Sequence, residues 1–95
     1  MPTVWGNLDR VHSDAAGDKW IQVKAVLPGG VAIRIRALIE HYTTLIRGVE
    51  RVDLSSLREG EPVEVTYHNG SKGLMEAETV YVQPDDVAVS QRAIG

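Results

Sequence analysis

The fold is decided by the stretch WIQVKAVLPGGVAIRIR, which spans residues 20–36. Apolar residues occupy every second position on both sides of a Pro/Gly break. They are Ile21, Val23, Ala25 and Leu27 before Pro28–Gly30, and Val31, Ile33 and Ile35 after it. Such alternation is typical of half-buried strands, and two such runs joined by a short break predict a hairpin. A three-residue loop keeps both apolar sets on one face, so we expect a β-hairpin with that face in the core.

The same register predicts an outer face that is basic and carries a tryptophan. Lys24 stands opposite Arg34, and Gln22 stands opposite Arg36. Trp20 lies near Leu38. From residue 19 to residue 39 the chain has four basic residues and no acidic one. OB folds use a basic sheet face beside an exposed tryptophan to follow a phosphate backbone and to stack a base. The candidate ligand-binding face therefore consists of Trp20, Gln22, Lys24, Arg34 and Arg36.

Glutamates on later strands offer a purely structural explanation of this face. Glu64, Glu76 and Glu78 lie in two stretches that we expect to form the last strands. Closure of a barrel can set their carboxylates beside the basic hairpin as cross-strand ion pairs. Runs of surface charge are most often solvated faces, so this explanation stands beside the ligand-binding one.

One segment of the chain fits two kinds of secondary structure. The apolar residues between 37 and 47 recur at helical spacing, but the segment is rich in Ile, Thr and Tyr, which prefer strands. We expect a strand there, with a helix as the alternative. Further on, residues 53–60 are typical of one helical turn, with Asp53 as its N-cap and Gly60 at its end.

The remaining patterns complete an all-β chain. Strand patterns occupy residues 4–11, 62–67 and 74–82, and turn-forming residues fill 13–18 and 68–73. We expect a five- or six-stranded OB-like barrel over residues 1–83, with room for one short helix between strands. Residues 84–95 show little apolar pattern, and we expect them to form a mobile C-terminal tail.

The second half of the chain also has a familiar form. The run Leu54–Val65 reads as a leucine turn, then Gly, an acidic residue and alternating valines, and a polar loop and the run Met75–Val82 follow. Together with Gly6–Val11 and Thr43–Ile46, this pattern resembles the small OB-like β-barrel domains of unknown function found in many bacteria, often in exported proteins. The resemblance covers most of residues 4–82. It implies the fold and the core positions, and it implies no particular chemistry.

The sequence shows no motif for catalysis, a metal or a cofactor. There is no cysteine, which excludes disulfides and thiolate metal sites. His12, His41 and His68 are isolated from other ligands at useful local spacing, and Met75 is the only methionine beyond the first residue. No nucleophile elbow, zinc-protease motif or phosphate-cradling loop is present. We expect a protein that is not an enzyme, without a metal or cofactor.

Charge and the first residues bear on partners and location. The net charge is −3, with eight Lys/Arg against six Asp/Glu in residues 1–58 and two against seven in residues 59–95. A general nucleic-acid binder is usually basic overall, so only a local basic patch is compatible with that class. No apolar run is long enough to span a membrane, and the first residues lack the features of a signal peptide. We expect a cytoplasmic protein or a domain cut from an exported one.

These observations lead to three functional hypotheses. The first is a non-catalytic binding or accessory module that recognises another macromolecule, a protein or a polysaccharide, through one barrel face. The second is a single-stranded nucleic-acid-binding domain that uses Trp20, Lys24, Arg34 and Arg36. The third is a purely structural domain of a longer protein. Salt separates the first two hypotheses, because binding to phosphates weakens steeply as salt rises.

Overall fold

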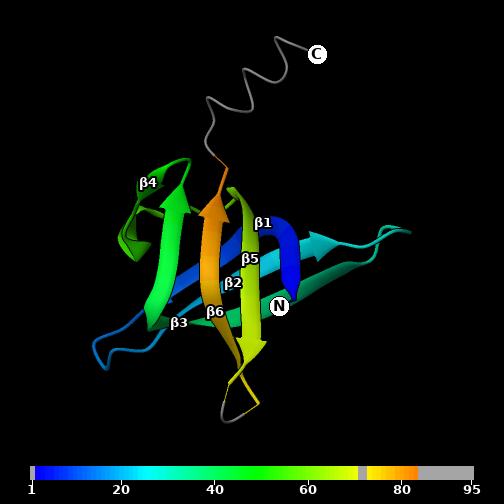
Figure 1. Cartoon of the computed structure of the whole chain (residues 1–95). Coiled ribbons are helices and arrows are strands. Elements are labelled where there is room, and N and C mark those ends of the chain that lie inside the picture. Colours follow the sequence, from blue (N-terminus) through cyan, green and yellow to red (C-terminus); the bar gives the residue numbers. More distant parts are fainter. Residues whose placement is uncertain (1, 71–72, 84–95) are drawn as a thin grey trace.

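Six strands and one short 3₁₀ turn make up the computed structural model, which describes residues 2–70 and 73–83 (Figure 1). The elements are β1 (Thr3–Ser13), β2 (Lys19–Val26), β3 (Ala32–Arg47), β4 (Glu50–Arg51), η1 (Leu54–Ser56), β5 (Pro62–Asn69) and β6 (Met75–Val82). The tail expected at residues 84–95 lies outside the described residues. None of the described helical segments is long and apolar enough to cross a membrane.

Five of the strands close into a barrel. Strand β1 pairs antiparallel with both β2 and β5, and β3 pairs antiparallel with β2 and parallel with β6. The antiparallel pair of β5 and β6 completes the circle, and β4 adds two residues to the edge of β3. A three-strand meander closed by a parallel pairing of its third strand is an OB-like arrangement. The prediction of a small all-β, OB-like barrel is confirmed.

The β2–β3 hairpin has the register that its sequence predicts. Gln22 pairs with Arg36, and Lys24 pairs with Arg34. The loop holds three residues, with both of its glycines at positive φ, and the Leu27 N–H donates to the Val31 carbonyl over 2.8 Å. A side chain at either glycine would be strained there, because the left-handed region suits residues without a Cβ.

The segment that fitted two kinds of structure is a strand, as expected. It is the second part of β3. The whole strand has 16 residues, and its main partner changes along its length from β2 to β6. The pairing with β6 is irregular between Ile39 and Thr44. At this irregularity the Thr43 hydroxyl donates to the Ala77 carbonyl and accepts from the Glu40 N–H. The side chain thus satisfies backbone groups at the point where the ladder is interrupted.

The barrel core is aliphatic and comes from inward-facing positions of every long strand. It contains Leu8 of β1, Ile21 and Val23 of β2, Ala37 and Leu45 of β3, Val63 and Val65 of β5, and Ala77, Val80 and Val82 of β6. Leu57, just after η1, adds to this core from the connection between β4 and β5. Because phenylalanine is absent, β-branched side chains fill the interior.

The predicted core face of the hairpin is only partly correct. Val31 is 60% exposed and Leu27 is 43% exposed, although both follow the apolar alternation. The reason is length: the hairpin extends beyond the barrel body (Figure 1), so its last apolar residues have no opposite wall among the described strands.

Strand β1 bends from one neighbour to the other at Gly6. Gly6 pairs with Val63 of β5, and the next residue, Asn7, pairs with both Pro62 of β5 and Lys24 of β2. A Cβ at residue 6 would collide with the backbone carbonyl of Lys24. Glycine is needed here for close approach of two backbones rather than for an unusual φ.

Two local expectations need correction. The helical turn is shorter than predicted and covers Leu54–Ser56, and the Asp53 side chain makes no capping hydrogen bond. Instead, the Ser56 hydroxyl donates to the Asp53 carbonyl. His68, which was expected in a loop, belongs to β5, because that strand continues to Asn69.

Candidate functional site

The five candidate residues lie on the outer face of the β2–β3 hairpin. Trp20, Gln22 and Lys24 come from β2, and Arg34 and Arg36 come from the neighbouring positions of β3. Lys24 and both arginines are exposed, whereas Trp20 and Gln22 are half-buried. Burial of the alternate residues of β2 in the core makes this set point outward.

Trp20 is packed between side chains from both neighbouring strands. The Arg36 guanidinium carbon lies 3.8 Å from the centre of the indole ring. His12 of β1, the direct partner of Trp20, stacks on it with 4.8 Å between ring centres and 12° between ring planes. Trp20 therefore points outward, as its parity predicts, but it is covered rather than fully exposed. A guanidinium over an indole is an attractive cation–π pair.

An aspartate from β1 joins this face. The pairing of β1 with β2 shifts between Leu8 and Arg10, so Asp9 is the extra residue of a β-bulge. Its carboxylate accepts a hydrogen bond of 2.6 Å from the Gln22 side-chain amide and one of 3.2 Å from Arg34. A bulge can turn a side chain toward a face that simple alternation would deny it.

The contacts of Asp9 extend into one network across three strands. The Arg36 guanidinium donates to the Gln22 side-chain carbonyl over 3.3 Å, and the Gln22 amide in turn donates to Asp9. The hydrogen bond from Gln22, together with the charge of Arg34, lowers the pKa of the Asp9 carboxyl below its ordinary value. We call Asp9, Trp20, Gln22, Lys24, Arg34 and Arg36 the outer face.

The glutamates suggested as partners of the basic hairpin residues lie beside other side chains. Glu76 and Glu78 of β6 flank His68, with Glu78 Oε1 2.6 Å from Nδ1 and Glu76 Oε1 3.2 Å from Nε2. The Nδ1 contact is an ion-pair distance that is not aligned as a hydrogen bond. Glu64 stands between Trp5 and Tyr81 on β5. The acid that pairs with the basic hairpin is thus Asp9.

Tyr42 completes the group around His68. Its hydroxyl donates a hydrogen bond to the Glu76 carboxylate and lies 3.4 Å from His68 Nε2. The hydrogen bond to Glu76, with partial burial and the nearby carboxylates, raises the pKa of Tyr42 far above its ordinary value. Sequence reasoning missed this group, because residues 42, 68 and 76 come from three strands with no local spacing to connect them.

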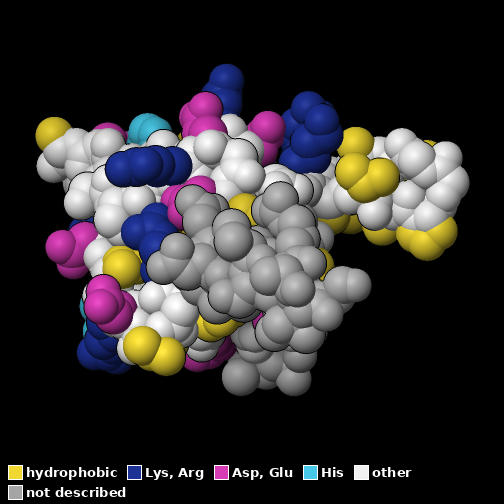
Figure 2. Space-filling view, turned by 90° about the horizontal axis from the view of Figure 1, so that it is seen from above, with side chains coloured by type: hydrophobic (Ala, Val, Ile, Leu, Met, Phe, Trp, Pro, Cys, Tyr) yellow, Lys and Arg dark blue, Asp and Glu magenta, His cyan; other side chains and the backbone are white. Residues whose placement is uncertain are grey.

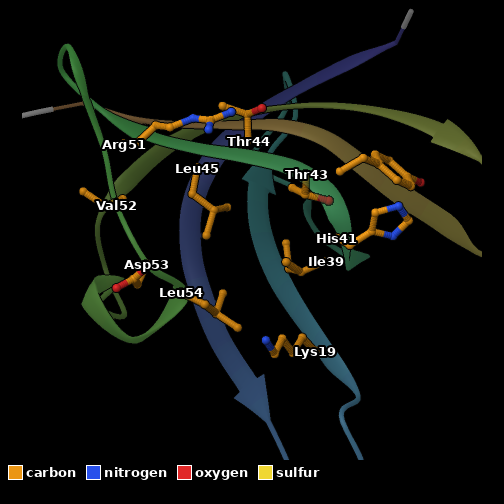
Figure 3. Close-up of a pocket in the computed structure, with 11 residues that line it drawn as sticks. Lys19, Ile39, His41, Thr43, Thr44, Leu45, Arg51, Val52, Asp53 and Leu54 are labelled. Atoms are coloured by element: carbon orange, nitrogen blue, oxygen red, sulfur yellow. The ribbon is translucent and has the colours of Figure 1, made fainter.

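One open hollow lies at the opposite end of β2 from the hairpin loop. It has a volume of about 450 Å³ and is lined by the second part of β3 and the segment from β4 to η1. Figure 3 shows Ile39, Leu45 and Leu54 around its middle, with Lys19 reaching toward it from β2. Its wall mixes apolar side chains with both signs of charge, and no motif in the sequence marked it.

A second, apolar hollow of about 220 Å³ borders Trp5, Gly6, Val63, Glu64 and Tyr81. Trp5 is 64% exposed here, whereas Trp20, the tryptophan expected to be exposed, is half-buried. Trp5 lies on the first part of β1, which pairs with β5 before the strand reaches β2, so the hollow is on a different wall of the barrel from the outer face.

The described parts of the chain, residues 2–70 and 73–83, hold no group of three His, Asp or Glu side chains arranged to bind a metal ion. Carboxylates at opposite edges of the His68 ring explain why that group does not converge on one point. Comparison of the chain with protein-family models, with curated proteins and with solved structures finds no match in any of the three.

Proposed function

We propose that this barrel is a non-catalytic binding module that recognises a partner protein through the outer face. The observation that carries the proposal is the fixed position of Arg36, which packs on Trp20 and donates to Gln22. Tryptophan and arginine are the residues that most often dominate the affinity of protein interfaces. The likeness of residues 4–82 to small bacterial OB-like domains of unknown function is compatible with an accessory role.

Preorganisation strengthens this argument. A long arginine side chain normally loses rotamer freedom when it is fixed in an interface. Here Arg36 is held by the indole and by the Gln22 amide, and Gln22 is held by Asp9. Less ordering is then needed when a partner carboxylate or carbonyl binds the remaining guanidinium N–H groups, of which arginine has five.

The same contacts favour a protein over a polysaccharide or a nucleic acid. Sugars and bases stack on an open aromatic ring, whereas Trp20 is already contacted by Arg36 and His12. The carboxylate of Asp9 also offsets part of the positive charge that would attract phosphates. Trp and Arg are enriched at protein interfaces, and the charged Lys24 and Asp9 are compatible with the polar rim of such an interface.

Photo-crosslinking in the cells that express the chain tests this proposal. A benzophenone amino acid replaces Lys24 on the outer face or, as the matched control, Val49, which is 99% exposed on the turn before β4. We expect one discrete protein adduct from position 24, lost with Arg36→Glu in the same chain and not given by position 49. The absence of an adduct at position 24, or the same adduct from both positions, contradicts the proposal.

One observation favours single-stranded nucleic acid as a second candidate. Lys24 and Arg34 stand directly opposite each other, and like charges in that position are unfavourable by about 0.2–1 kcal/mol. A phosphate between them would relieve this repulsion. An NMR titration with oligothymidine at low and moderate salt tests it, with the Trp20 indole and the amides of Lys24 and Arg34 as probes. Salt-sensitive shifts confined to the hairpin support this candidate, and no shift at high excess rejects it.

A further inference from the structure

We propose that the tip of the β2–β3 hairpin, residues 26–32, inserts into the surface of a membrane that contains anionic lipids. This inference goes beyond the proposed function, because the inserted side chains lie outside the outer face and the partner is a lipid rather than a protein; only Lys24 and Arg34 belong to both. It rests on three observations: the tip is apolar on both sides, its backbone is tied into a loop, and basic residues stand at its base.

The hairpin tip projects from the barrel and carries no polar side chain. Its sequence is VLPGGVA, and Val26, Leu27 and Val31 are 67%, 43% and 60% exposed. Figure 2 shows hydrophobic side chains on a lobe that extends from the body, with basic side chains near the place where the lobe joins it. Single exposed apolar residues are common on soluble proteins, whereas a contiguous apolar projection marks an interaction site.

Both faces of the tip are apolar, and this points to a deformable partner. Successive residues of a strand alternate between faces, so Val26 and Ala32 lie on the outer side, and Leu27 and Val31 on the inner side. A flat protein surface could cover only one of these faces. The boundary between lipid head groups and acyl chains surrounds an inserted segment on all sides.

The backbone of the tip is suited to an apolar medium. Unpaired backbone N–H groups are costly to bury in lipid. Pro28 has no N–H, the Leu27 N–H donates to the Val31 carbonyl, and the Gly30 N–H donates to the Leu27 carbonyl over 3.0 Å. The turn therefore carries few free donors into the membrane, and its glycines allow the tight shape.

Two basic residues stand at the base of the tip, and one of them, Arg34, is also paired with Asp9. Lys24 lies three residues before Leu27, and Arg34 three residues after Val31. At about 3.3 Å per residue, the charges are about 10 Å from the inserted side chains. Amphipathic segments enter the interface to about 5–10 Å, so both cations would meet the phosphate layer when the tip is inserted. A second copy of this chain is disfavoured as the occupant, because joining two tips would bring Lys24 and Arg34 of the two copies together.

Sedimentation of the full chain with vesicles tests the inference. The vesicles contain phosphatidylcholine alone or phosphatidylcholine with phosphatidylglycerol, and the main variant is Leu27→Asp combined with Val31→Asp. The matched control is Val49→Asp, an exposed valine on a different turn. We expect binding to anionic vesicles by the wild type, a loss of about tenfold or more in the double variant, and no change in the control.

Charge reversal at the two ends of one strand gives the second arm. Lys24→Glu at the base of the tip is compared with Lys19→Glu at the far end of β2, beside the hollow of about 450 Å³. We expect about a tenfold loss for Lys24→Glu and a much smaller loss for Lys19→Glu, because basic residues contribute chiefly within a Debye length of the surface. Unfolding midpoints equal to wild type show that these surface variants are folded.

Several outcomes would overturn the inference. They are no binding to anionic vesicles, equal binding by the double tip variant, and equal losses for Lys19→Glu and Lys24→Glu. Self-association that the tip variant abolishes, in the absence of vesicle binding, would identify a second copy as the occupant instead. Arg36→Glu separates this inference from the proposed function: it should remove the protein adduct while most vesicle binding persists.

Discussion

The β2–β3 hairpin has one alternating apolar pattern and two opposite surroundings. In the part that belongs to the barrel wall, Ile21 and Val23 are buried in the core. In the part that reaches past the barrel, Val31 follows the same parity and is 60% exposed. Alternation therefore identifies which face of a strand is apolar, but the opposite wall of the barrel decides where that face becomes core. The apolar part of the hairpin that extends beyond the opposite wall is the tip, residues 26–32, which we propose inserts into a membrane.

The largest effect should come from the closed part of the barrel. Leu8 is 2% exposed and contributes one of the largest fully buried side chains. We expect Leu8→Ala to lower the free energy of unfolding by about 2–5 kcal/mol, because it removes apolar contacts and leaves a cavity. Urea denaturation followed by circular dichroism measures the change. A loss below that range would mean that the barrel interior relaxes around the gap. The contrast in burial between Leu8 and the hairpin tip would then be smaller than the structure indicates.

The next effect concerns the point where β1 leaves β2. We expect Gly6→Ala to lower the free energy of unfolding by about 1–3 kcal/mol, because the new methyl group must push the Lys24 backbone away. The same denaturation measurement applies, with Val49→Ala as the control at an exposed position. Tolerance of alanine at residue 6 would show that the two strands can separate there without loss of closure.

The bulged aspartate gives a pH-dependent effect. The pKa of Asp9 is lower in the folded chain than its ordinary value of 3.8, so its charged form stabilises the fold. This contribution is fully present above the ordinary pKa and is lost as pH falls through the folded pKa. We therefore expect wild type to be more stable than Asp9→Asn at about pH 6, with the difference shrinking below about pH 4. Thermal unfolding at a series of pH values checks it, and a difference that does not depend on pH contradicts it.

The smallest effect should come from the projecting hairpin. We expect Val31→Ser to change the free energy of unfolding by less than about 0.5 kcal/mol, because the side chain has little contact to lose. Urea denaturation beside Leu8→Ala gives the direct contrast between a buried residue of the barrel and an exposed residue of the hairpin loop. A cost close to that of a core residue would mean that the tip packs on another part of the chain.

Local sequence rules account for much of the barrel. The hairpin register follows from parity and a three-residue loop, and the strand at residues 37–47 follows from its β-branched residues. The outer position of Trp20, Lys24 and Arg36 follows from the same parity. These features could be predicted because each depends on residues that are close together in the sequence.

The missing parts of the site depend on distant neighbours. Asp9 reaches the outer face only because a β-bulge turns it there, and no residue type announces a bulge at that position. The pairing of Tyr42 with Glu76, and the covering of Trp20 by His12, require knowledge of which strands become adjacent. The exposure of Leu27 depends on how far the other strands extend. Each of these is a property of closure rather than of local pattern.

The parallel pairing of β3 with β6 also has a consequence for the order of folding. Residues of the thirties and forties must find residues of the seventies and eighties, whereas β2 and β3 meet across three residues. Contacts close in sequence form quickly, and the loss of chain entropy slows distant ones. During synthesis, the hairpin can form while β6 is still inside the ribosome. Its apolar tip would then be exposed before the barrel closes.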